Sequence, residues 1–276
     1  MAVNGDKVGY LGPDGTYSFL AAKKLCPHAD LCAYSSFFTL FKALEDGEVN
    51  AIVVPVENTV NGAVTQVLDL FEESENICAS ASCAVRVDHR LATLEGADIS
   101  KIRRVYSHSQ ALAQCSKFLA DKLPQAKLIE TSSTAESLDK IKSGEDAGIV
   151  GSHCQREGVA LSAYSVSDEE KNYTQFLFAQ KGEPSEDAFS DRIFFTVTCQ
   201  HRVGTLVELL LILRDSSISM TEIESRPIKN RTGEFRFFIE VEGNYADPGI
   251  RRALKRVQAE ANSYKLLGCY VCGLPK

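Results

Sequence analysis

Apolar and polar positions along the chain repeat in one order: a short apolar run, a polar turn, then apolar residues at helical spacing. The runs are rich in Val, Ile, Leu and Ala, which is typical of strands buried on both faces of a sheet. They predict strands in the first two thirds of the chain at Lys7–Leu11, Ala51–Val54, Ile77–Val87, Arg103–Tyr106, Lys127–Glu130, Ala147–Val150 and Thr174–Ala179. Strands that alternate with helices in this way predict a doubly wound α/β sheet.

Helical spacing between these strands predicts helices at Tyr17–Leu25, Phe37–Leu44, Val64–Phe71 and Ala111–Leu123, with another beginning at Thr131–Thr134. Because strands lie on both sides of a middle segment, we expect two lobes with a cleft between them. Lobe one would comprise residues 1–80 and 160–182, and lobe two residues 81–159. Pro55 ends the apolar run that begins at Ala51, so that strand is expected to stop there.

The last third of the chain follows a different order. Strands are expected at Arg192–Thr198, Met220–Ile228, Glu234–Val241 and Lys265–Val271, and helices at Gly204–Leu213 and Ile250–Ala261. The order β-α-β-β-α-β predicts a ferredoxin-like domain. The polar stretch Lys181–Ser190 separates it from the first part and is typical of a domain linker. We therefore expect one domain over residues 1–182 and a second over residues 190–276.

The length and net charge of the chain limit the classes of function and partner to be expected. A chain of 276 residues can hold about two domains. Its net charge of −7 argues against nucleic acid or an acidic membrane surface as a partner. The charge is uneven: residues 190–276 carry 13 Lys and Arg against 10 Asp and Glu, which leaves 17 against 27 in the rest. No apolar run is long enough to span a bilayer and no export pattern opens the chain, so a cytoplasmic location is expected.

The cysteines offer no metal or redox chemistry. In a chain without an export pattern, the nine cysteines are expected to be reduced thiols. Cys269 and Cys272 form one C-x-x-C pair, but no second pair or histidine has the spacing of a zinc site. The glycines near the first strand do not form the G-x-G-x-x-G pattern of a dinucleotide site. We therefore expect no metal and no cofactor.

Small polar side chains follow the carboxyl ends of the predicted strands. Asn58 and Asn61 come directly after the buried run at Ala51, and Thr16 follows the Gly-rich turn after the first strand. Open α/β sheets bind ligands at this edge, and the free N–H groups of a helix N-terminus favour anions. The pattern predicts a site for a small anionic ligand, although capped turns without a ligand would read the same.

Eight motifs carry a family resemblance. They are YLGPDGTYS at Tyr10–Ser18, VPVENTVNG at Val54–Gly62, SHSQALAQC at Ser107–Cys115, SSTAES at Ser132–Ser137, NYTQF at Asn172–Phe176, GTLVELL at Gly204–Leu210, IESRP at Ile223–Pro227 and LLGCY at Leu266–Tyr270. With them in this order, the chain resembles prephenate dehydratase, a catalytic domain followed by an ACT regulatory domain. The resemblance implies a two-lobed, periplasmic-binding-protein-like α/β domain whose cleft converts prephenate to phenylpyruvate, carbon dioxide and water.

The resemblance also implies roles for individual residues. It assigns catalysis to Thr174, Asn58, Thr59 and Ser107, and substrate binding to Gly15, Thr16, Glu57, Asn61, His108, Gln110, Ser133, Thr134, Gln175 and Phe176. The Thr174 hydroxyl would donate to the departing ring oxygen, whereas Glu57 would mainly hold its loop. The family usually has arginine at the position of Gln175, so a clamp for a carboxylate is missing. Lys171, Arg156 or His153 could supply charge instead.

A phenylalanine effector site is implied in the second domain. It would involve Gly204, Thr205, Leu206, Val207, Glu224, Ser225, Arg226 and Pro227 between paired ACT domains, in a homodimer or homotetramer. These segments could also be a plain dimer interface. Two other functions stay open: arogenate dehydratase, which has the same site with an amino group on the substrate, and an amino-acid-binding regulatory homologue without catalysis. A chain cut near Glu183 is expected to lose phenylalanine sensitivity and retain some activity.

Overall fold

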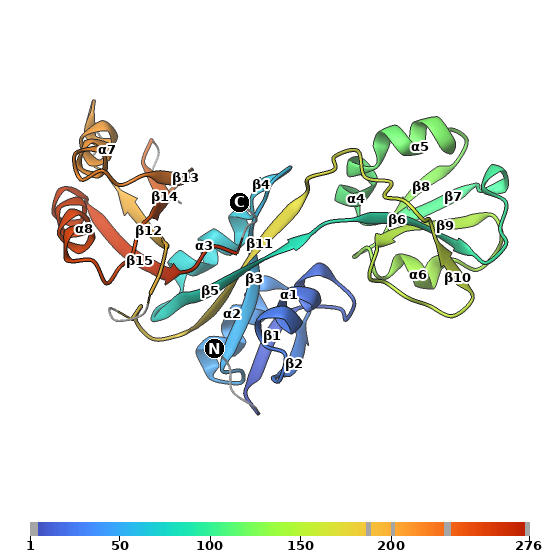
Figure 1. The fold of residues 1–276 in the computed structure, drawn as a ribbon, viewed down its shortest axis with the longest axis horizontal. Helices are drawn as coiled ribbons and strands as arrows, with labels where there is room; N and C mark the ends of the chain where they lie inside the picture. The colour runs from blue at the N-terminus through green and yellow to red at the C-terminus, as the bar shows by residue number, and fades with distance from the viewer. Residues whose placement is uncertain (1–4, 186–188, 200–201, 229–232, 274–276) are drawn as a thin grey trace.

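The computed structural model describes residues 5–185, 189–199, 202–228 and 233–273 (Figure 1). Two β-sheets organise them. A ten-stranded sheet runs through lobe one and on into the C-terminal domain, and a five-stranded sheet forms lobe two. Lobe two and the C-terminal domain lie at opposite ends of the molecule with lobe one between them (Figure 1). The expected two-lobed α/β architecture followed by a second domain is confirmed.

Lobe one is a mixed sheet in the order β5-β11-β3-β1-β2, in which β1, β2 and β3 are parallel. Its strands are β1 (Lys7–Leu11), β2 (Asp30–Tyr34), β3 (Ala51–Asn58), β4 (Gly62–Ala63), β5 (Ile77–Arg86) and β11 (Tyr173–Lys181), and its helices are α1 (Tyr17–Leu25), α2 (Phe37–Asp46) and α3 (Thr65–Glu73). The side chains of Ile52, Val53 and Val54 are fully buried, which agrees with a central strand. Strand β2 was not predicted.

The prediction that the strand stops at Pro55 is wrong, because β3 continues to Asn58. Pairing between β1 and β3 ends at Val53, so Pro55 lies beyond that ladder. On the other side, the register with β11 shifts between Gln175 and Phe176, where Phe176 faces Pro55. A strand can pass through proline at such an irregularity, since no regular ladder hydrogen bond is lost there.

Lobe two is a smaller sheet in the order β10-β6-β9-β7-β8. Its strands are β6 (His89–Leu94), β7 (Arg104–Ser107), β8 (Lys127–Glu130), β9 (Asp146–Gly151) and β10 (Val159–Leu161), and its helices are α4 (Ser109–Gln114), α5 (Ser116–Lys122), α6 (Ser137–Lys140) and the 3-10 turn Ile99–Lys101. The predicted helix Ala111–Leu123 is broken at Cys115. Asp168 caps the second part by accepting from the Ser116 hydroxyl at 2.9 Å and the Lys117 amide at 3.1 Å.

The turn after β8 also differs from the prediction, because no helix begins at Thr131–Thr134. Glu136 accepts from the Ser132 amide at 3.0 Å and from the Ser132 hydroxyl at 2.6 Å, and its own amide donates to Ser133 at 3.1 Å. These bonds fold the segment into a turn, and helix α6 begins only at Ser137.

The chain crosses between the lobes twice, once between β5 and β6 and once on the way into β11. Strand β5 pairs with β11 as far as Arg86, so residues 81–86 belong to the sheet of lobe one. Strand β10 pairs with β6, so Val159–Leu161 belong to lobe two. The first crossing therefore lies at Val87 and Asp88. It comes later than the predicted boundary at residue 80, because β5 continues to Arg86 within the sheet of lobe one.

The C-terminal domain has the βαββαβ order that was predicted. Its elements are β12 (Arg192–Thr198), α7 (Thr205–Asp215), β13 (Met220–Pro227), β14 (Phe235–Glu242), α8 (Pro248–Glu260) and β15 (Ser263–Tyr270). The strand order β13-β14-β12-β15 is that of a ferredoxin-like sheet. Helices α7 and α8 cover one face, where Ile193 and Val197 are buried. Phe194 and Phe238 point to the other face and share a core with α2 and α3 of lobe one.

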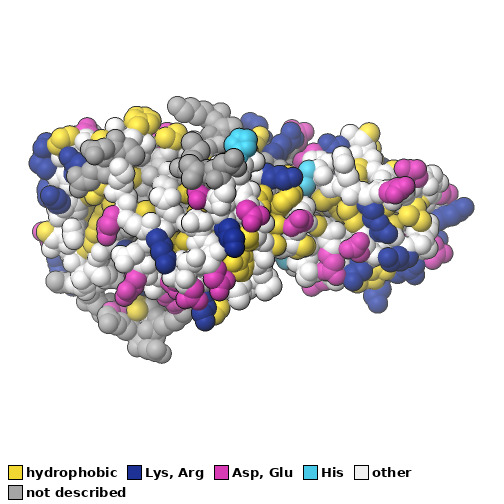
Figure 2. Space-filling model, turned by 90° about the horizontal axis from the view of Figure 1, so that it is seen from below, with side chains coloured by type: hydrophobic (Ala, Val, Ile, Leu, Met, Phe, Trp, Pro, Cys, Tyr) yellow, Lys and Arg dark blue, Asp and Glu magenta, His cyan; other side chains and the backbone are white. Residues whose placement is uncertain are grey.

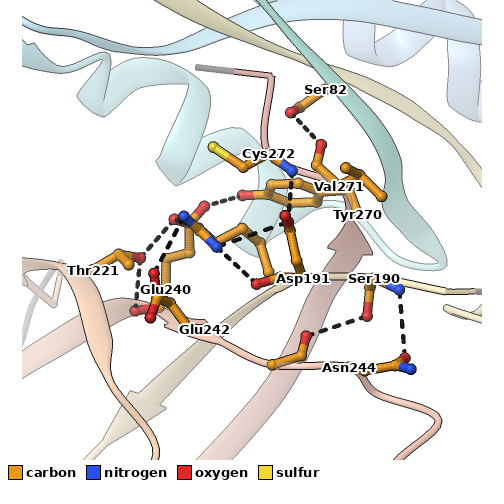
Figure 3. Close-up of polar contacts among 12 residues, drawn as sticks. Ser82, Ser190, Asp191, Thr221, Glu240, Glu242, Asn244, Tyr270, Val271 and Cys272 are labelled. Carbon is orange, nitrogen blue, oxygen red and sulfur yellow. Dashed lines mark hydrogen bonds and ion pairs between the residues drawn. The ribbon is translucent and has the colours of Figure 1, made fainter. Parts of the chain in front are cut away.

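This domain is built into lobe one. Strand β15 pairs with β5 at Gly268 and Ala79, and a Cβ at position 268 would lie 2.6 Å from the Ala79 carbonyl oxygen, so only glycine fits. Beyond β15, the Cys272 amide donates to Asp191 at 2.7 Å and Ser82 donates to the Val271 carbonyl at 2.8 Å (Figure 3). The chain after β15 is therefore held on β5.

The surface and the thiols add little chemistry of their own. Lys and Arg side chains intermingle with Asp and Glu over the face of lobe two seen in Figure 2. None of the nine cysteines, which all lie in the described ranges, forms a disulfide. In the described ranges, no helix has the length and apolar character needed to cross a membrane. Those same ranges contain no group of three or more His, Cys, Asp or Glu arranged to hold a metal ion.

Candidate active site

A cleft of about 350 Å³ lies between the two lobes. Lobe one contributes the β1–α1 turn, β3 and β11, and lobe two contributes β6, α4 and the turn after β8. Predicted site residues that line the cleft are Thr16, Asn58, His108, Gln110, Ser133, Thr134, Thr174 and Phe176. They come from both lobes, so the site is complete only when the lobes face each other as they do here.

The Thr174 hydroxyl is placed by Asn58. The Asn58 side-chain amide donates to Thr174 Oγ1 at 3.0 Å across the β3–β11 pair. Asn58 is itself held, because its Oδ1 accepts from the Val60 and Asn61 amides at 3.1 and 3.0 Å. Within the part of the chain that the structure describes, no acceptor for the Thr174 proton is found. That proton is therefore available to a bound ligand.

Further hydrogen-bond donors face the cleft from both lobes. Thr16 caps α1 by accepting from the Phe19 amide, and the first-turn amides of Tyr17 and Ser18 have no partner within the helix. His108 accepts from the Gln110 amide through Nδ1 at 3.3 Å, so its Nε2 carries the proton. Such neutral donors suit an anion.

Positive charge is scarce at this site. No Lys or Arg appears among the described residues that line the cleft. Of the residues proposed to supply charge, Arg156 donates to the Leu138 carbonyl, and His153 pairs with the Gly15 carbonyl at 2.8 Å. Lys171 is exposed. A dianion in this cleft would therefore be held mainly by neutral donors and helix N-termini.

Several predicted site residues lie outside the cleft lining. Ser107 is fully buried and donates to the Ile149 carbonyl at 2.6 Å, which joins β7 to β9. The Thr59 hydroxyl accepts from the Tyr173 amide at 3.0 Å and supports the β3–β11 end. Asn61 donates to Asn58. These residues support the lining residues from behind.

Gln175 also lies outside the lining. Its neighbours Thr174 and Phe176 both face the cleft, and successive side chains of a strand point to opposite faces. Gln175 is 4% exposed and is paired across the sheet with Glu57. An arginine at this position would therefore meet Glu57 before any ligand in the cleft.

Glu57 belongs to a group of carboxylates between lobe one and the C-terminal domain. Burial and the nearby Glu240 raise the pKa of Glu57. Burial, Glu57, Glu240 and Glu224 together raise the pKa of Glu222 to about 8. Glu240 itself accepts from Tyr270 at 2.5 Å and Thr221 at 2.6 Å (Figure 3). The contact between the two parts of the chain therefore favours a protonated Glu222.

Glu222→Gln is expected to raise the melting temperature at pH 8 more than at pH 5. The pKa of Glu222 is raised from 4.5 to about 8, so the folded protein binds more protons than the unfolded chain between these values. Stability contributed by this proton is complete below about pH 4.5 and is lost as the pH rises towards 8. Thermal unfolding at both pH values measures the effect.

The exposed Glu95→Gln on lobe two is the matched control for Glu222→Gln. It should change the melting temperature by the same small amount at both pH values. If Glu222→Gln behaved like this control, the proton would not belong to the domain contact.

Polar residues of the site that were not predicted individually include Tyr17, His89, Gln114 and Asn172. His89 and Gln114 line the cleft, and Asn172 lies behind Asn58 with 1% exposure. Gln114 and Asn172 lie inside quoted motifs, so their amide side chains were a usable signal. His89 has no local signal, because it comes near Gln114 and Tyr17 only in the folded chain.

The lobes touch each other at Gly15 and Tyr17. The Gly15 carbonyl accepts from His153, and the Tyr17 hydroxyl donates to the Asp88 carbonyl at 3.2 Å. The Tyr17 ring lies edge-on to His153, with ring centroids 5.1 Å apart. Gly15 has a φ of +79°, which turns its carbonyl towards lobe two at low steric cost. Gly15 therefore joins the lobes beside the cleft.

The two segments predicted as an effector site lie at one end of the C-terminal sheet. Pro227 pairs with Phe235, and the adjacent Arg236 pairs with Thr198, where β12 ends before α7. Gly204 precedes α7 with a φ of +89°. Strand β13 is the edge strand of the sheet, and Ile223 on it is 39% exposed.

Helix α3 connects this domain with the cleft. Arg226 binds Asp69 through two bonds of 2.9 and 3.3 Å, and Arg236 binds Glu72 at 2.9 Å. Lys265 donates to the last carbonyls of the helix, those of Phe71 at 2.8 Å, Glu72 at 2.8 Å and Ser74 at 2.5 Å. At its other end the helix follows Val64, which lines the cleft.

Comparison with known proteins agrees with this geometry. The profile of the family described as prephenate dehydratase matches residues 8–184, which is more than half of the chain. The bifunctional chorismate mutase/prephenate dehydratase of Neisseria gonorrhoeae is 35% identical over 95% of this chain and 74% of its own length. The prephenate dehydratase of Amycolatopsis methanolica is 34% identical over 96% of this chain and 88% of its own.

A solved structure gives the same result for the whole fold. The crystal structure of prephenate dehydratase from Arthrobacter aurescens, in complex with L-Phe, superposes with a TM-score of 0.87 at 25% identity. The match covers 98% of this chain and 92% of that one. The C-terminal domain is therefore part of the shared architecture, although the family profile ends before it.

Proposed function

Because the chain belongs to the prephenate dehydratase family, we propose that its cleft converts prephenate to phenylpyruvate, carbon dioxide and water, a carbon–oxygen lyase reaction. The observation that carries the proposal is the Thr174 hydroxyl: it lines the cleft, it accepts from Asn58 at 3.0 Å, and no acceptor for its own proton is found among the described residues.

The reaction needs what this cleft provides. The bond to the ring carboxylate breaks, its electron pair enters the ring, and the ring hydroxyl takes one proton and leaves as water. Aromaticity drives these steps, so the protein must bind a dianion, orient it and assist the leaving oxygen. Thr174 donates to that oxygen, while the N-terminus of α1 and the His108 Nε2 donate to carboxylates. Ser133 and Thr134 contribute from lobe two.

Two alternatives are separated by experiment. Arogenate carries an amino group in place of the keto group, so turnover of prephenate and arogenate should be compared on the same preparation. A binding protein without catalysis would bind one of these compounds and release no carbon dioxide. Thr174, Asn58 and Thr16 in one cleft favour catalysis over that reading.

The proposal extends to regulation. We assign residues 1–182 to catalysis and residues 190–276 to an ACT domain that binds L-phenylalanine as a feedback effector at Gly204–Val207 and Glu224–Pro227. The L-Phe in the Arthrobacter structure supports the choice of effector. The edge strand β13 and the exposed Val207 and Ile223 support pairing of two such domains in a homo-oligomer. A cytoplasmic place of action belongs to the same proposal.

Helix α3 would couple the two sites. Arg226 lies in the proposed effector segment and binds Asp69, and the same helix begins beside the cleft. An effector that binds one conformation of β13 more tightly than another would therefore also change the contacts of α3. Allostery requires such a difference in effector affinity between two states of the protein.

Asp69→Asn is expected to raise the phenylalanine concentration needed for half-inhibition by about threefold to tenfold, while the uninhibited turnover stays unchanged. The ion pair is partly exposed, so its loss should weaken coupling more than folding. Inhibition curves measure the change. Asp46→Asn on α2, which is exposed, is the control. An unchanged curve for Asp69→Asn would remove this ion pair from the coupling.

A further inference from the structure

A line of side-chain hydrogen bonds crosses from lobe one to lobe two along the wall of the cleft. Asn58 donates to Asn172 Oδ1 at 2.7 Å, and Asn172 donates to Gln114 Oε1 at 3.1 Å. Gln114 Oε1 is also 3.0 Å from His89 Nε2. Asn58 belongs to lobe one, Gln114 and His89 belong to lobe two, and Asn172 lies in the crossing segment. The line therefore exists only while the lobes face each other.

The direction of every bond in the line follows from the backbone. The Val60 and Asn61 amides can only donate, so the atom that they contact on Asn58 is the oxygen. Asn58 must then donate from nitrogen to Asn172, which leaves the Asn172 nitrogen to donate to Gln114. Since Gln114 accepts with its oxygen, His89 Nε2 has to carry the ring proton. Burial lowers the pKa of His89, which favours this neutral form.

The line of hydrogen bonds ends at the Thr174 hydroxyl, which the proposed mechanism uses. The same Asn58 nitrogen that donates to Asn172 also donates to Thr174 Oγ1. A hydroxyl that accepts there points its own proton elsewhere, and Thr174 is one of the residues that line the cleft. Without the Asn172 oxygen, Asn58 would keep its hydrogen bonds with the backbone and lose its shortest side-chain acceptor. The Asn58 amide would then be less firmly positioned to donate to Thr174.

We propose that Asn172 is a positioning residue: it bridges Asn58 and Gln114, and so aims the Thr174 hydroxyl only when lobe two is docked. Asn172 does not line the cleft and would not touch substrate. His89, at the far end, fixes Gln114 for the same purpose. The proposal rests on the proposed dehydratase function.

Asn172→Ala should lower kcat for prephenate about tenfold to a hundredfold, the size expected for a catalytic group that is slightly misplaced. KM should change less than threefold. The decisive measurement is the same substitution in a Thr174→Val background, where it should cause no further loss because both changes remove one function. Equal losses in both backgrounds would overturn the proposal, as would a wild-type kcat for Asn172→Ala.

Two measurements at the other end do not depend on the folding of Asn172→Ala. His89→Leu should lower kcat, and His89→Gln, which can still donate to Gln114, should recover most of the loss. In the unmodified protein, ¹⁵N NMR should show His89 protonated on Nε2, the nitrogen that lies 3.0 Å from Gln114 Oε1. Equal activity of the two His89 variants, or an Nδ1–H tautomer, would contradict the bond direction derived above.

Failure of this inference and failure of the proposed function can be told apart. An unmodified protein that does not turn over prephenate would end the dehydratase assignment. An active unmodified protein whose Asn172 and His89 variants keep full kcat would end only the positioning role.

Discussion

Thr174→Val should lower the turnover of prephenate about a hundredfold to a thousandfold, with a smaller change in KM. Valine has nearly the shape of threonine and suits a strand, so the β3–β11 pairing should survive. What is lost is the hydroxyl that lines the cleft and that Asn58 holds at 3.0 Å. Because that donor acts on the oxygen as it departs, its loss should appear in kcat.

Thr174→Ser is the matched control, since it keeps the hydroxyl and removes only a methyl group. It should retain far more turnover than Thr174→Val, and both variants should unfold at nearly the temperature of the unmodified protein. Near-full kcat in Thr174→Val would mean that another group assists the leaving oxygen.

Deleting residues 184–276 should leave a chain that does not fold stably. The sequence alone suggested that such a chain would retain some activity, but the structure gives a different expectation. Phe194, Phe238, Leu267 and Tyr270 are buried in one core with lobe one. Each large apolar side chain moved out of water contributes about 1.5–3 kcal/mol, against a total stability of about 5–15 kcal/mol for a typical domain. The deletion would also leave β5 as a bare edge strand.

Cutting the linker shows whether the C-terminal domain itself is needed or only an unbroken polypeptide chain. A protease site inserted between Glu183 and Pro184 lies in the stretch before β12, where Glu183 is exposed. After cleavage the two pieces should elute together and keep prephenate turnover, because the shared core and the contacts of Lys265 with α3 remain. A deleted chain that folds and is as active as the full protein would show that the shared core is dispensable.

The sequence predicts the parts of this fold that depend on local pattern. Continuous apolar runs such as Ile52–Val54 mark central strands, and small polar residues after them mark the edge where the cleft lies. The break at Cys115 was not predictable, because its cause is Asp168, which is 51 residues away from the amide that it caps. For the same reason His89 gave no signal, as its partners lie on α1 and α4.

One other difference, the face on which Gln175 lies, had a signal in the sequence. Thr174 and Phe176 cannot share a face with Gln175 in a regular strand, so the period of two already placed Gln175 away from the cleft. Asn172, two residues before Thr174, lies in the crossing segment just ahead of β11, and its contact with Asn58 depends on the register between β11 and β3. That register includes a shift at Pro55 that no local pattern reveals.

The central claim is that this cleft turns prephenate into phenylpyruvate with neutral donors. It is tested most directly by incubating the purified full chain with prephenate and measuring phenylpyruvate and carbon dioxide over time. The account predicts that both form in equal amounts, and that Thr174→Val, folded and tested alongside, forms neither at a comparable rate. Binding of prephenate without release of carbon dioxide by the unmodified protein would contradict the account.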